Sequence, residues 1–213
     1  MTRKHDLGIN HTMLADRQFG VILAGGKSLR MGGGDKCLLT LADQSLLHHV
    51  INRLAPQMTD LALNANGNPK RFASFGLSVL HDSVADFPGP LAGILAAMDW
   101  AASHGAASVV TVAADTPFFP NNLVTRFQQV GGLCLAATRR GNAKTDWHPT
   151  FGHWPVCLRH DMRQDLLKGQ RKVIDWALDH GAQAVMFDTD DDPFFNINTP
   201  DDLAEANRRT TAP

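Results

Sequence analysis

Short runs of strand-forming residues alternate with helical patterns along this chain, and that alternation limits the fold more than any other feature of the sequence. The apolar, β-rich runs have the length of ordinary strands and lie at 19–24, 60–65, 77–80, 107–114, 132–138 and 182–187. Helices are predicted near 46–54, 90–105, 121–129, 156–167, 171–180 and 200–209. Strands that alternate with helices are joined by right-handed crossovers, which make neighbouring strands parallel. The sequence therefore predicts the α/β class: a single Rossmann-like domain with a mostly parallel sheet and helices on both faces.

The length and the ends of the chain indicate one domain. Its 213 residues suffice for a substantial core, and no internal repeat or low-complexity linker suggests a second domain. Residues 1–17 are polar and aperiodic. We therefore expect a mobile N-terminal tail over 1–17 and a single folded domain over 18–209.

Composition excludes several classes of protein. The formal net charge is −1, so the chain has no general basic field that would hold nucleic acid or an anionic membrane. No run reaches the roughly 18 apolar residues of a membrane span, and the N-terminus lacks the apolar core of a signal peptide. Cys37, Cys134 and Cys157 are far apart and lack zinc-ligand spacing. We expect reduced thiols in a soluble, cytoplasmic protein.

The segment 20–36, "GVILAGGKSLRMGGGDK", places a glycine-rich, basic loop directly after the first predicted strand. In an α/β sheet, ligands bind where loops leave the carboxyl ends of the strands. Glycine lets backbone N–H groups turn toward an anion, and the loop has glycine at Gly25, Gly26, Gly32, Gly33 and Gly34. Lys27, Arg30 and Lys36 add positive charge. The loop thus has the composition of a phosphate-binding cradle.

Two common phosphate-binding motifs do not fit this loop. A P-loop that ends in Gly26 and Lys27 would need its first glycine at Val21, inside the predicted strand. A dinucleotide fingerprint that starts at Gly32 would need a glycine where Cys37 stands. A flexible surface loop with scattered charges is the alternative. So many glycines and cations immediately after a core strand favour the cradle.

The loop "LAGGKSLRMGGGDK" resembles the signature loop of nucleotidyltransferases that transfer a nucleoside monophosphate from a triphosphate. Within them the chain resembles the molybdenum cofactor guanylyltransferases through "RMGG", "NAN" at 64–66, "PGPLAGI" at 88–94, "DTPF" at 115–118, "HPT" at 148–150 and "NINTPDDL" at 196–203. The resemblance covers about residues 19–205. It implies GTP and molybdopterin as substrates, Mg²⁺ as cofactor, and molybdopterin guanine dinucleotide and pyrophosphate as products. It also implies transient contacts with molybdenum cofactor biosynthesis proteins and acceptor molybdoenzymes.

Other readings of the same residues remain open. A sibling nucleotidyltransferase could use CTP with molybdopterin, or could act on a sugar or polyol phosphate. From a different class, a nucleotide-binding module without turnover would keep the cradle alone. Measurement of nucleotide preference and pyrophosphate release separates these alternatives.

The polar residues at the predicted strand ends are the candidate site. Asp115 follows an apolar run, where a carboxylate would lie at the mouth of the site and could hold Mg²⁺. Asp82 follows another run, and its carboxylate suits the two donors on the guanine edge. The resemblance implies catalytic roles for Arg30, Lys36 and Asp115, a metal at Asp115, and nucleotide binding by Leu23, Ala24, Gly25, Gly26, Lys36, Asn64, Asp82 and Asp115. Ordinary turn chemistry is the alternative for Asn64 and Asp82.

The acceptor side is less defined in the sequence. "TDWHPTFGHW" at 145–154 could stack on the pterin, with His148 as a candidate, or form a buried edge strand. Thr199 can cap the helix predicted after it, and Asn198 has a functional or a capping role. No general base is required, because a phosphate acceptor is mostly dianionic near neutral pH.

Overall fold

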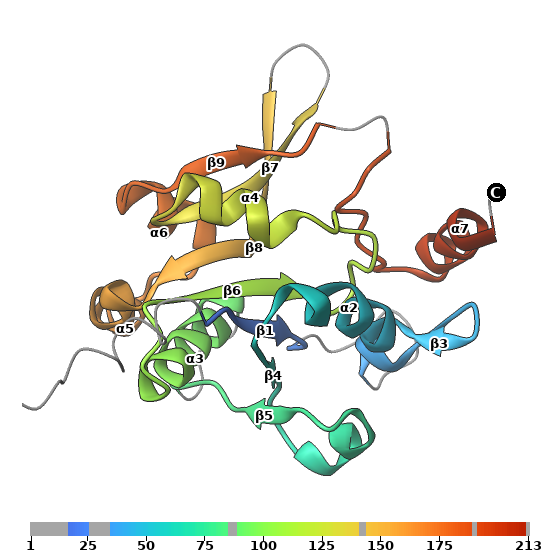
Figure 1. The fold of residues 1–213 in the computed structure, drawn as a ribbon, viewed down its shortest axis with the longest axis horizontal. Helices are drawn as coiled ribbons and strands as arrows, with labels where there is room; N and C mark the ends of the chain where they lie inside the picture. Colours follow the sequence, from blue (N-terminus) through green and yellow to red (C-terminus); the bar gives the residue numbers. More distant parts are fainter. Residues whose placement is uncertain (1–16, 26–34, 85–88, 141–143, 189–190, 212–213) are drawn as a thin grey trace, which may run out of the picture.

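The structure is a computed structural model of the chain, and it describes residues 17–25, 35–84, 89–140, 144–188 and 191–211. Its centre is a seven-stranded sheet in the order β5-β4-β1-β6-β8-β7-β9 (Figure 1). The strands are β1 (Phe19–Leu23), β4 (Asp60–Asn64), β5 (Ser78–Leu80), β6 (Ser108–Ala113), β7 (Cys134–Arg140), β8 (Lys144–Pro155) and β9 (Gln183–Met186). Only β8 runs antiparallel to its neighbours, β6 and β7. The predicted α/β class with a mostly parallel sheet is confirmed.

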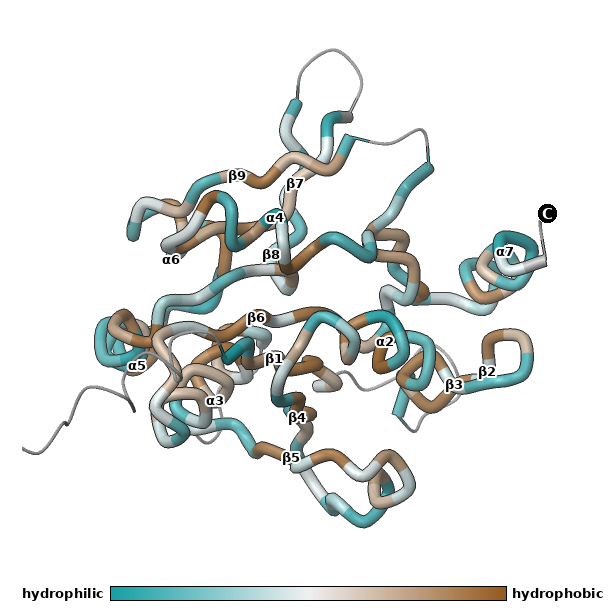
Figure 2. Tube along the Cα trace, viewed as in Figure 1, coloured by the Kyte–Doolittle hydropathy of each residue, from teal (hydrophilic) through white to brown (hydrophobic). Residues whose placement is uncertain are grey.

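Helices cover both faces of the sheet, as predicted. The helices are α2 (Leu46–Leu54), α3 (Pro90–Ser103), α4 (Leu123–Val130), α5 (Arg159–Leu167), α6 (Val173–Asp179) and α7 (Pro200–Thr211), and of these α2 to α6 pack on the sheet. On one face, α2 and α4 pack against a core that includes Ile22 and Val112. On the other, α3, α5 and α6 pack against a core that includes Val21 and Trp154. Figure 2 shows hydrophobic residues following the strands between these layers.

The two helices nearest the first strand have different surroundings and different patterns. Helix α2 begins after Ser45, whose hydroxyl accepts from the backbone N–H of His48 at 3.2 Å, and one stripe of it is buried. Helix α3 begins at Pro90 and is apolar on nearly all sides, because it is enclosed by the sheet and α5. Because α3 is buried in this way, its N-terminal turn comes close to the strand ends.

Smaller elements connect this framework to the end of the chain. Strands β2 (Thr40–Leu41) and β3 (Gln44–Ser45) form a short hairpin, and α7 packs on it around Leu41 and Ile197. The side-chain oxygen of Asn207 accepts from the N–H of Ala42 at 2.8 Å. The 3-10 helices are η2 (Lys36–Leu38), η3 (Ala55–Gln57), η4 (Pro69–Phe75) and η5 (Val156–Leu158). Helix α7 and the segment before it thus return to the region of Lys36.

The aromatic segment at 145–154 is a strand, but not the edge strand that the sequence suggested. It lies in β8, in the interior of the sheet between β6 and β7, and Trp154 is fully buried. The Trp154 indole donates to Thr111 Oγ1 at 2.8 Å. Pairing with β7 shifts register across residues 149–151, where Pro149 has no N–H to offer the ladder. Local sequence could indicate a strand here, but not its partners.

Two further expectations concern the ends and the membrane. The predicted mobile tail at 1–17 lies outside the described residues except for Arg17. Among the helices of the described residues, none has the length and apolar character needed to cross a bilayer.

Candidate active site

Four neighbouring parallel strands end level with one another, which brings their following residues to one edge. Leu23 of β1 is in register with Asn64 of β4 and Ala113 of β6, and Asn64 is in register with Leu80 of β5. The chain passes from β1 to β4 on one side and reaches β6 on the other, so the loop after β1 leaves the sheet where the strand order reverses. The polar residues after β4 and β5 therefore flank that loop on one side, and Asp115 flanks it on the other.

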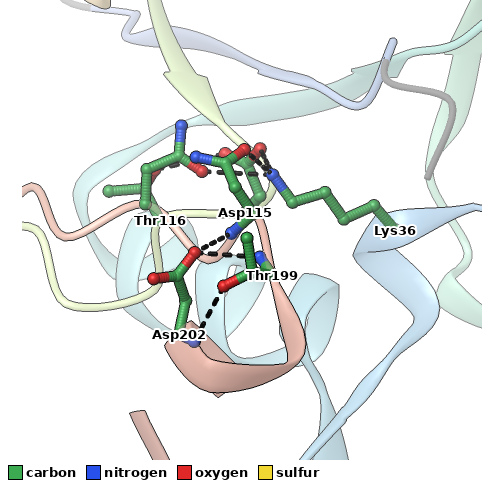
Figure 3. A network of polar contacts seen from close by, with 7 residues as sticks. Lys36, Asp115, Thr116, Thr199 and Asp202 are labelled. Carbon is green, nitrogen blue, oxygen red and sulfur yellow. Dashed lines mark hydrogen bonds and ion pairs between the residues drawn. The ribbon is translucent and has the colours of Figure 1, made fainter. Parts of the chain in front are cut away.

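Lys36 and Asp115 meet at this edge, although they are far apart in sequence (Figure 3). Lys36 Nζ donates to Asp115 Oδ2 at 2.6 Å, to Asn198 Oδ1 at 2.5 Å and to Asn196 Oδ1 at 3.2 Å. The Lys36 side chain is 11% exposed and that of Asp115 is 24% exposed. A cation thus occupies a cage of three side-chain oxygens that opens toward solvent.

The start of α7 holds the asparagines of this cage in place. The N–H of Ile197 donates to the backbone oxygen of Asp115 at 3.0 Å. Thr199 and Asp202 form a capping box, in which Thr199 Oγ1 accepts from the Asp202 N–H and Asp202 Oδ2 accepts from the N–H groups of Asn198 and Thr199. These backbone and hydroxyl contacts, led by the Asn198 N–H, lower the pKa of Asp202, and the Lys36 charge acts in the same direction. Asn198 therefore has a fixed backbone next to the cap and a side chain turned to Lys36.

A second polar cluster lies around Asp82, on the other side of the loop. We call it the Asp82 corner, and we call the cage around the Lys36 ammonium the Lys36 corner. Asp82 Oδ1 accepts from Asn64 Nδ2 at 3.0 Å, and Asp82 Oδ2 accepts from Asn66 Nδ2 at 2.7 Å. Asn66 Oδ1 in turn accepts from the Asp82 N–H at 3.1 Å. A carboxylate has about four acceptor positions, so these bonds orient Asp82 and leave capacity for a ligand.

Asn64 acts in this arrangement through Asp82. Its side chain is buried, and its amide nitrogen donates to Asp82 and, at 3.2 Å, to the backbone oxygen of Leu80. The sequence suggested a direct contact between this amide and a base or ribose. In the structure the donor atoms of Asn64 are used to hold the strand end and the carboxylate.

Gly93, in the first turns of α3, makes room for Asn64. A Cβ at this position would lie 2.3 Å from Asn64 Oδ1 and 3.3 Å from Leu23 Cδ2. The absence of a side chain therefore lets α3 approach the strand ends closely. The closest neighbour of Gly93 is thus a residue of the candidate site.

We expect Gly93→Ala to destabilise the fold and to disturb the Asp82 corner, because the Asn64 amide must move. Overpacking of this kind costs about 1–3 kcal/mol, which thermal unfolding would show as a lower Tm. The double variant Gly93→Ala/Asn64→Ala relieves the clash and should be no less stable than Asn64→Ala alone. A Gly93→Ala protein with wild-type stability and wild-type GTP affinity would contradict this account.

The other predicted residues belong to the end of β1 and the loop after it, and the structure describes only some of them. Gly26 and Arg30 lie outside the described residues. Leu23 is partly buried, Ala24 is buried with its N–H donated to the Asn64 backbone oxygen at 2.9 Å, and Gly25 is exposed with open space around it. Gly25 is therefore the most accessible of these three backbone positions.

His148 is the candidate that the sequence offers for the acceptor side. Its ring stacks on Phe194 with centroids 4.2 Å apart, and its Nε2 is 3.0 Å from Thr138 Oγ1. Phe194 begins the segment that continues to Asn196 and Asn198. Through Phe194, His148 thus contacts the segment that carries the cage.

Sequence reasoning missed the roles of Asn66 and Asn196. The signal for Asn66 was present, because residues two apart in an extended chain project to the same side and "NAN" places two amides in that relation. Asn196 begins the quoted motif "NINTPDDL", but nothing local links it to Lys36, which is 160 residues away in the chain.

The thiol next to Lys36 is not set up for covalent chemistry. Cys37 adjoins Lys36, but burial, with the nearby Asp35 charge, raises the pKa of its thiol to about 12, so the thiolate nucleophile is not formed near neutral pH. Over the described residues, no group of three or more histidine, cysteine, aspartate or glutamate side chains could hold a metal ion. A metal ion at Asp115 would therefore need amide and substrate oxygens as its other ligands.

Comparison with known proteins finds relatives over most of the chain. A family model for a MobA-like NTP transferase domain matches residues 20–185. A molybdenum cofactor guanylyltransferase of Nitrobacter hamburgensis is 48% identical over 193 residues, covering 89% of this chain and 92% of the relative. One from a Bradyrhizobium species is 48% identical over 198 residues, covering 89% and 91%.

Solved structures share the fold at lower identity. The molybdopterin-guanine dinucleotide biosynthesis protein A of Archaeoglobus fulgidus has a TM-score of 0.68 at 21% identity, over 91% of this chain and 99% of that chain. A nucleotidyl transferase from Methanothermobacter has a TM-score of 0.67 at 15% identity, over 92% and 98%. The resemblance drawn from the motifs is confirmed by the sequence matches. With relatives nearly half identical over most of its length, this chain belongs to the molybdenum cofactor guanylyltransferase family of MobA-like nucleotidyltransferases.

Proposed function

We propose that this protein transfers GMP from GTP to the terminal phosphate of molybdopterin, with or without bound molybdenum. An oxygen of that phosphate attacks the α-phosphorus of GTP and forms a new P–O bond. The bond from the α-phosphorus to the bridging oxygen breaks, and pyrophosphate leaves with the electron pair. The observation that supports this most is the pair of corners flanking the loop after β1: a lysine–carboxylate–amide cage on one side and an oriented carboxylate on the other.

We assign each of the two corners to a different part of the nucleotide. Lys36 forms an ion pair with Asp115, and we assign it to the triphosphate, where it neutralises charge that develops on the transferring and leaving oxygens. Asp82 is a pure acceptor when ionised, so we assign it to the N1–H and amino group of guanine. By family resemblance, Arg30 and the backbone around Gly25 and Gly26 contact the phosphates. The reaction needs positioning and charge neutralisation rather than a base.

The residues present fit a magnesium ion. The Lys36 ammonium stands as a cation among Asp115 Oδ2, Asn198 Oδ1 and Asn196 Oδ1, which are oxygen ligands of the kind that Mg²⁺ prefers. Asp115 with one or both asparagines would hold the ion, together with phosphate oxygens of the substrate. When bound, Mg²⁺ supplies positive charge that offsets the repulsion between two anionic phosphates. Lys36 would then turn from Asp115 to the phosphates.

The acceptor is proposed to approach from the side of Asn198 and His148. His148 and Phe194 form a stacked pair. Phe194 is two residues before Asn196, which accepts from Lys36 together with Asn198. Transient contacts with the proteins that supply molybdopterin and collect the product belong to the same proposal.

Asp82→Asn should weaken the use of GTP more than that of ITP, which lacks the 2-amino group. GTP would lose charged bonds from two donors and ITP from one, and each such bond is worth about 1.5–3 kcal/mol. We expect the GTP/ITP ratio of kcat/KM to fall about tenfold or more. Asn66→Ala controls for the clamp, because it removes one donor and keeps the carboxylate. Equal losses for both nucleotides in Asp82→Asn would remove Asp82 from base recognition.

A nucleotide screen with molybdopterin as acceptor tests the function directly. Purified protein with Mg²⁺ should release pyrophosphate with GTP and form the guanine dinucleotide. Faster turnover with CTP would favour a cytidylyltransferase that acts on molybdopterin. Turnover with a sugar or polyol phosphate in place of molybdopterin would favour a nucleotidyltransferase for that acceptor. Binding of GTP without pyrophosphate release would indicate a module without turnover.

A further inference from the structure

Arg71 joins three segments around the candidate site. It lies in η4, and its guanidinium donates from Nη2 to the Asn66 backbone oxygen at 2.5 Å and from Nη1 to the Asn68 backbone oxygen at 2.8 Å. Its Nε lies 2.5 Å from Asp35 Oδ2, in the geometry of an ion pair rather than a hydrogen bond. The guanidinium also lies over the Phe72 ring, 4.6 Å from its centroid.

These contacts connect the two corners of the site. Asn66, whose carbonyl Arg71 holds, orients Asp82 through its side chain and accepts from the Asp82 N–H. On the other side, Asp35 directly precedes Lys36, whose ammonium is bound to Asp115. A continuous series of polar contacts and one peptide bond therefore runs from the base-side carboxylate to the triphosphate-side lysine, and Arg71 is at its middle.

The local backbone is shaped to admit this side chain. Gly67 has a φ of +84°, and a Cβ there would lie 3.0 Å from Arg71 Nη1. The turn between Asn66 and Asn68 therefore passes close against the guanidinium. With side chains of Arg71 and Asp35 only 28% and 23% exposed, the ion pair is partly shielded from solvent.

From these contacts we infer that Arg71 is a positioning residue that couples guanine recognition at Asp82 to phosphate placement by Lys36. This inference rests on the proposed function of the same two corners. A planar guanidinium has donors in fixed directions, so it can hold the Asn66 and Asn68 carbonyls and the Asp35 carboxylate at set separations. A lysine at this position could keep the charge pair but not the forked bonds. Loss of Arg71 should let both corners shift relative to each other.

The test compares Arg71→Met with a matched control, Arg17→Met. Arg17 also pairs with an aspartate at 2.5 Å, Asp60, and lies over a phenylalanine ring, but at the start of β1 and β4, the opposite end of these strands from the site. We expect Arg71→Met to lower kcat/KM for GTP about 10–100-fold, the range that a displacement of about 1 Å can cause. It should also lower the GTP/ITP ratio several-fold. Arg17→Met should lower Tm about as much as Arg71→Met does, but it should leave the GTP/ITP ratio unchanged.

Asp35→Asn separates the two halves of the coupling. It weakens the tie to the Lys36 loop, so kcat should fall. The bonds from Arg71 to the carbonyls of Asn66 and Asn68 stay, so the GTP/ITP ratio should remain within about twofold. Because the energies of two changes add only when the sites are uncoupled, Arg71→Met/Asp35→Asn should be no slower than Arg71→Met. Equal losses for GTP and ITP in Arg71→Met, of the size seen in Arg17→Met, would overturn the inference.

Two further measurements keep the outcome decisive. If Arg71→Met folds poorly, Arg71→Lys replaces it, and this variant should lose nucleotide selectivity despite its retained charge. Calorimetric affinities for GTP and ITP provide a second readout that needs no turnover. If the wild-type protein fails to transfer GMP, the proposed function fails, whereas unchanged selectivity in both Arg71 variants of an active protein overturns the coupling alone.

Discussion

Asp115→Ala is expected to reduce GMP transfer to less than about a tenth of the wild-type rate while the fold stays intact. Asp115 contributes the one carboxylate of the cage around Lys36, and a metal ion bound there would lose its charged ligand. The fold should tolerate the change, because the backbone oxygen of Asp115 keeps its bond from the Ile197 N–H. Pyrophosphate release measures turnover, and titration with Mn²⁺, followed by electron paramagnetic resonance, measures metal affinity without turnover.

Asp165→Ala is the matched control for this change. Asp165 also pairs with a lysine, Lys168, but it lies on α5 near the start of β6 (Figure 1), away from the carboxyl edge. Its loss should leave turnover and Mn²⁺ affinity unchanged. If Asp115→Ala keeps more than about a tenth of the activity and binds Mn²⁺ as the wild type does, Asp115 is not the metal ligand.

Lys36→Ala should lower kcat/KM for GTP about 10²–10³-fold. Removal of one charge-stabilising donor from an active site costs about 2.7–4 kcal/mol of transition-state stabilisation, and Lys36 is the described cation that contacts Asp115. The same change empties the cage of its ammonium and leaves the oxygens of Asp115, Asn196 and Asn198 free of competition. In the absence of nucleotide, the variant should therefore bind Mn²⁺ more tightly than the wild type.

These two readouts of Lys36→Ala move in opposite directions, which a merely unfolded or loosened site would not produce. Lys168→Ala provides the control, because it removes an exposed lysine from an ion pair with an aspartate at 3.2 Å. It should alter neither turnover nor Mn²⁺ affinity. An unchanged kcat/KM in Lys36→Ala would contradict the phosphate role, and weaker Mn²⁺ binding would contradict the shared cage.

The positions of Asp82 and Asp115 illustrate what could be predicted from local pattern. Each follows an apolar run that the sequence identifies as a strand, and strands linked by helices lie parallel, so their ends meet at one edge. The same logic anticipated Asn64 at the end of β4. It did not reveal that Asn64 and Asn66 both hold Asp82, because hydrogen-bond partners depend on side-chain orientation across two strands.

Strand β8 illustrates the opposite case. Its sequence mixes aromatic residues, histidines and Pro149, and its partners β6 and β7 cannot be read from that mixture. Burial of Phe151 and Trp154 between the helical layers decides its central place. The edge position was one of the two alternatives that the sequence left open, and it is not the observed one, because strand order follows from which faces pack together rather than from the strand's own residues.

From sequence alone, the alternation of strands and helices determined the α/β class. The sequence also showed a glycine-rich loop after the first strand and polar residues at the strand ends. These are local properties, set by side-chain period and backbone freedom within a few residues. Only the tertiary structure decided that Asn196 and Asn198 reach Lys36 across 160 and 162 residues, and that Arg71 ties Asp35 to Asn66. Such contacts join loops that are far apart in the chain, and no periodicity in the sequence records which loop ends will meet.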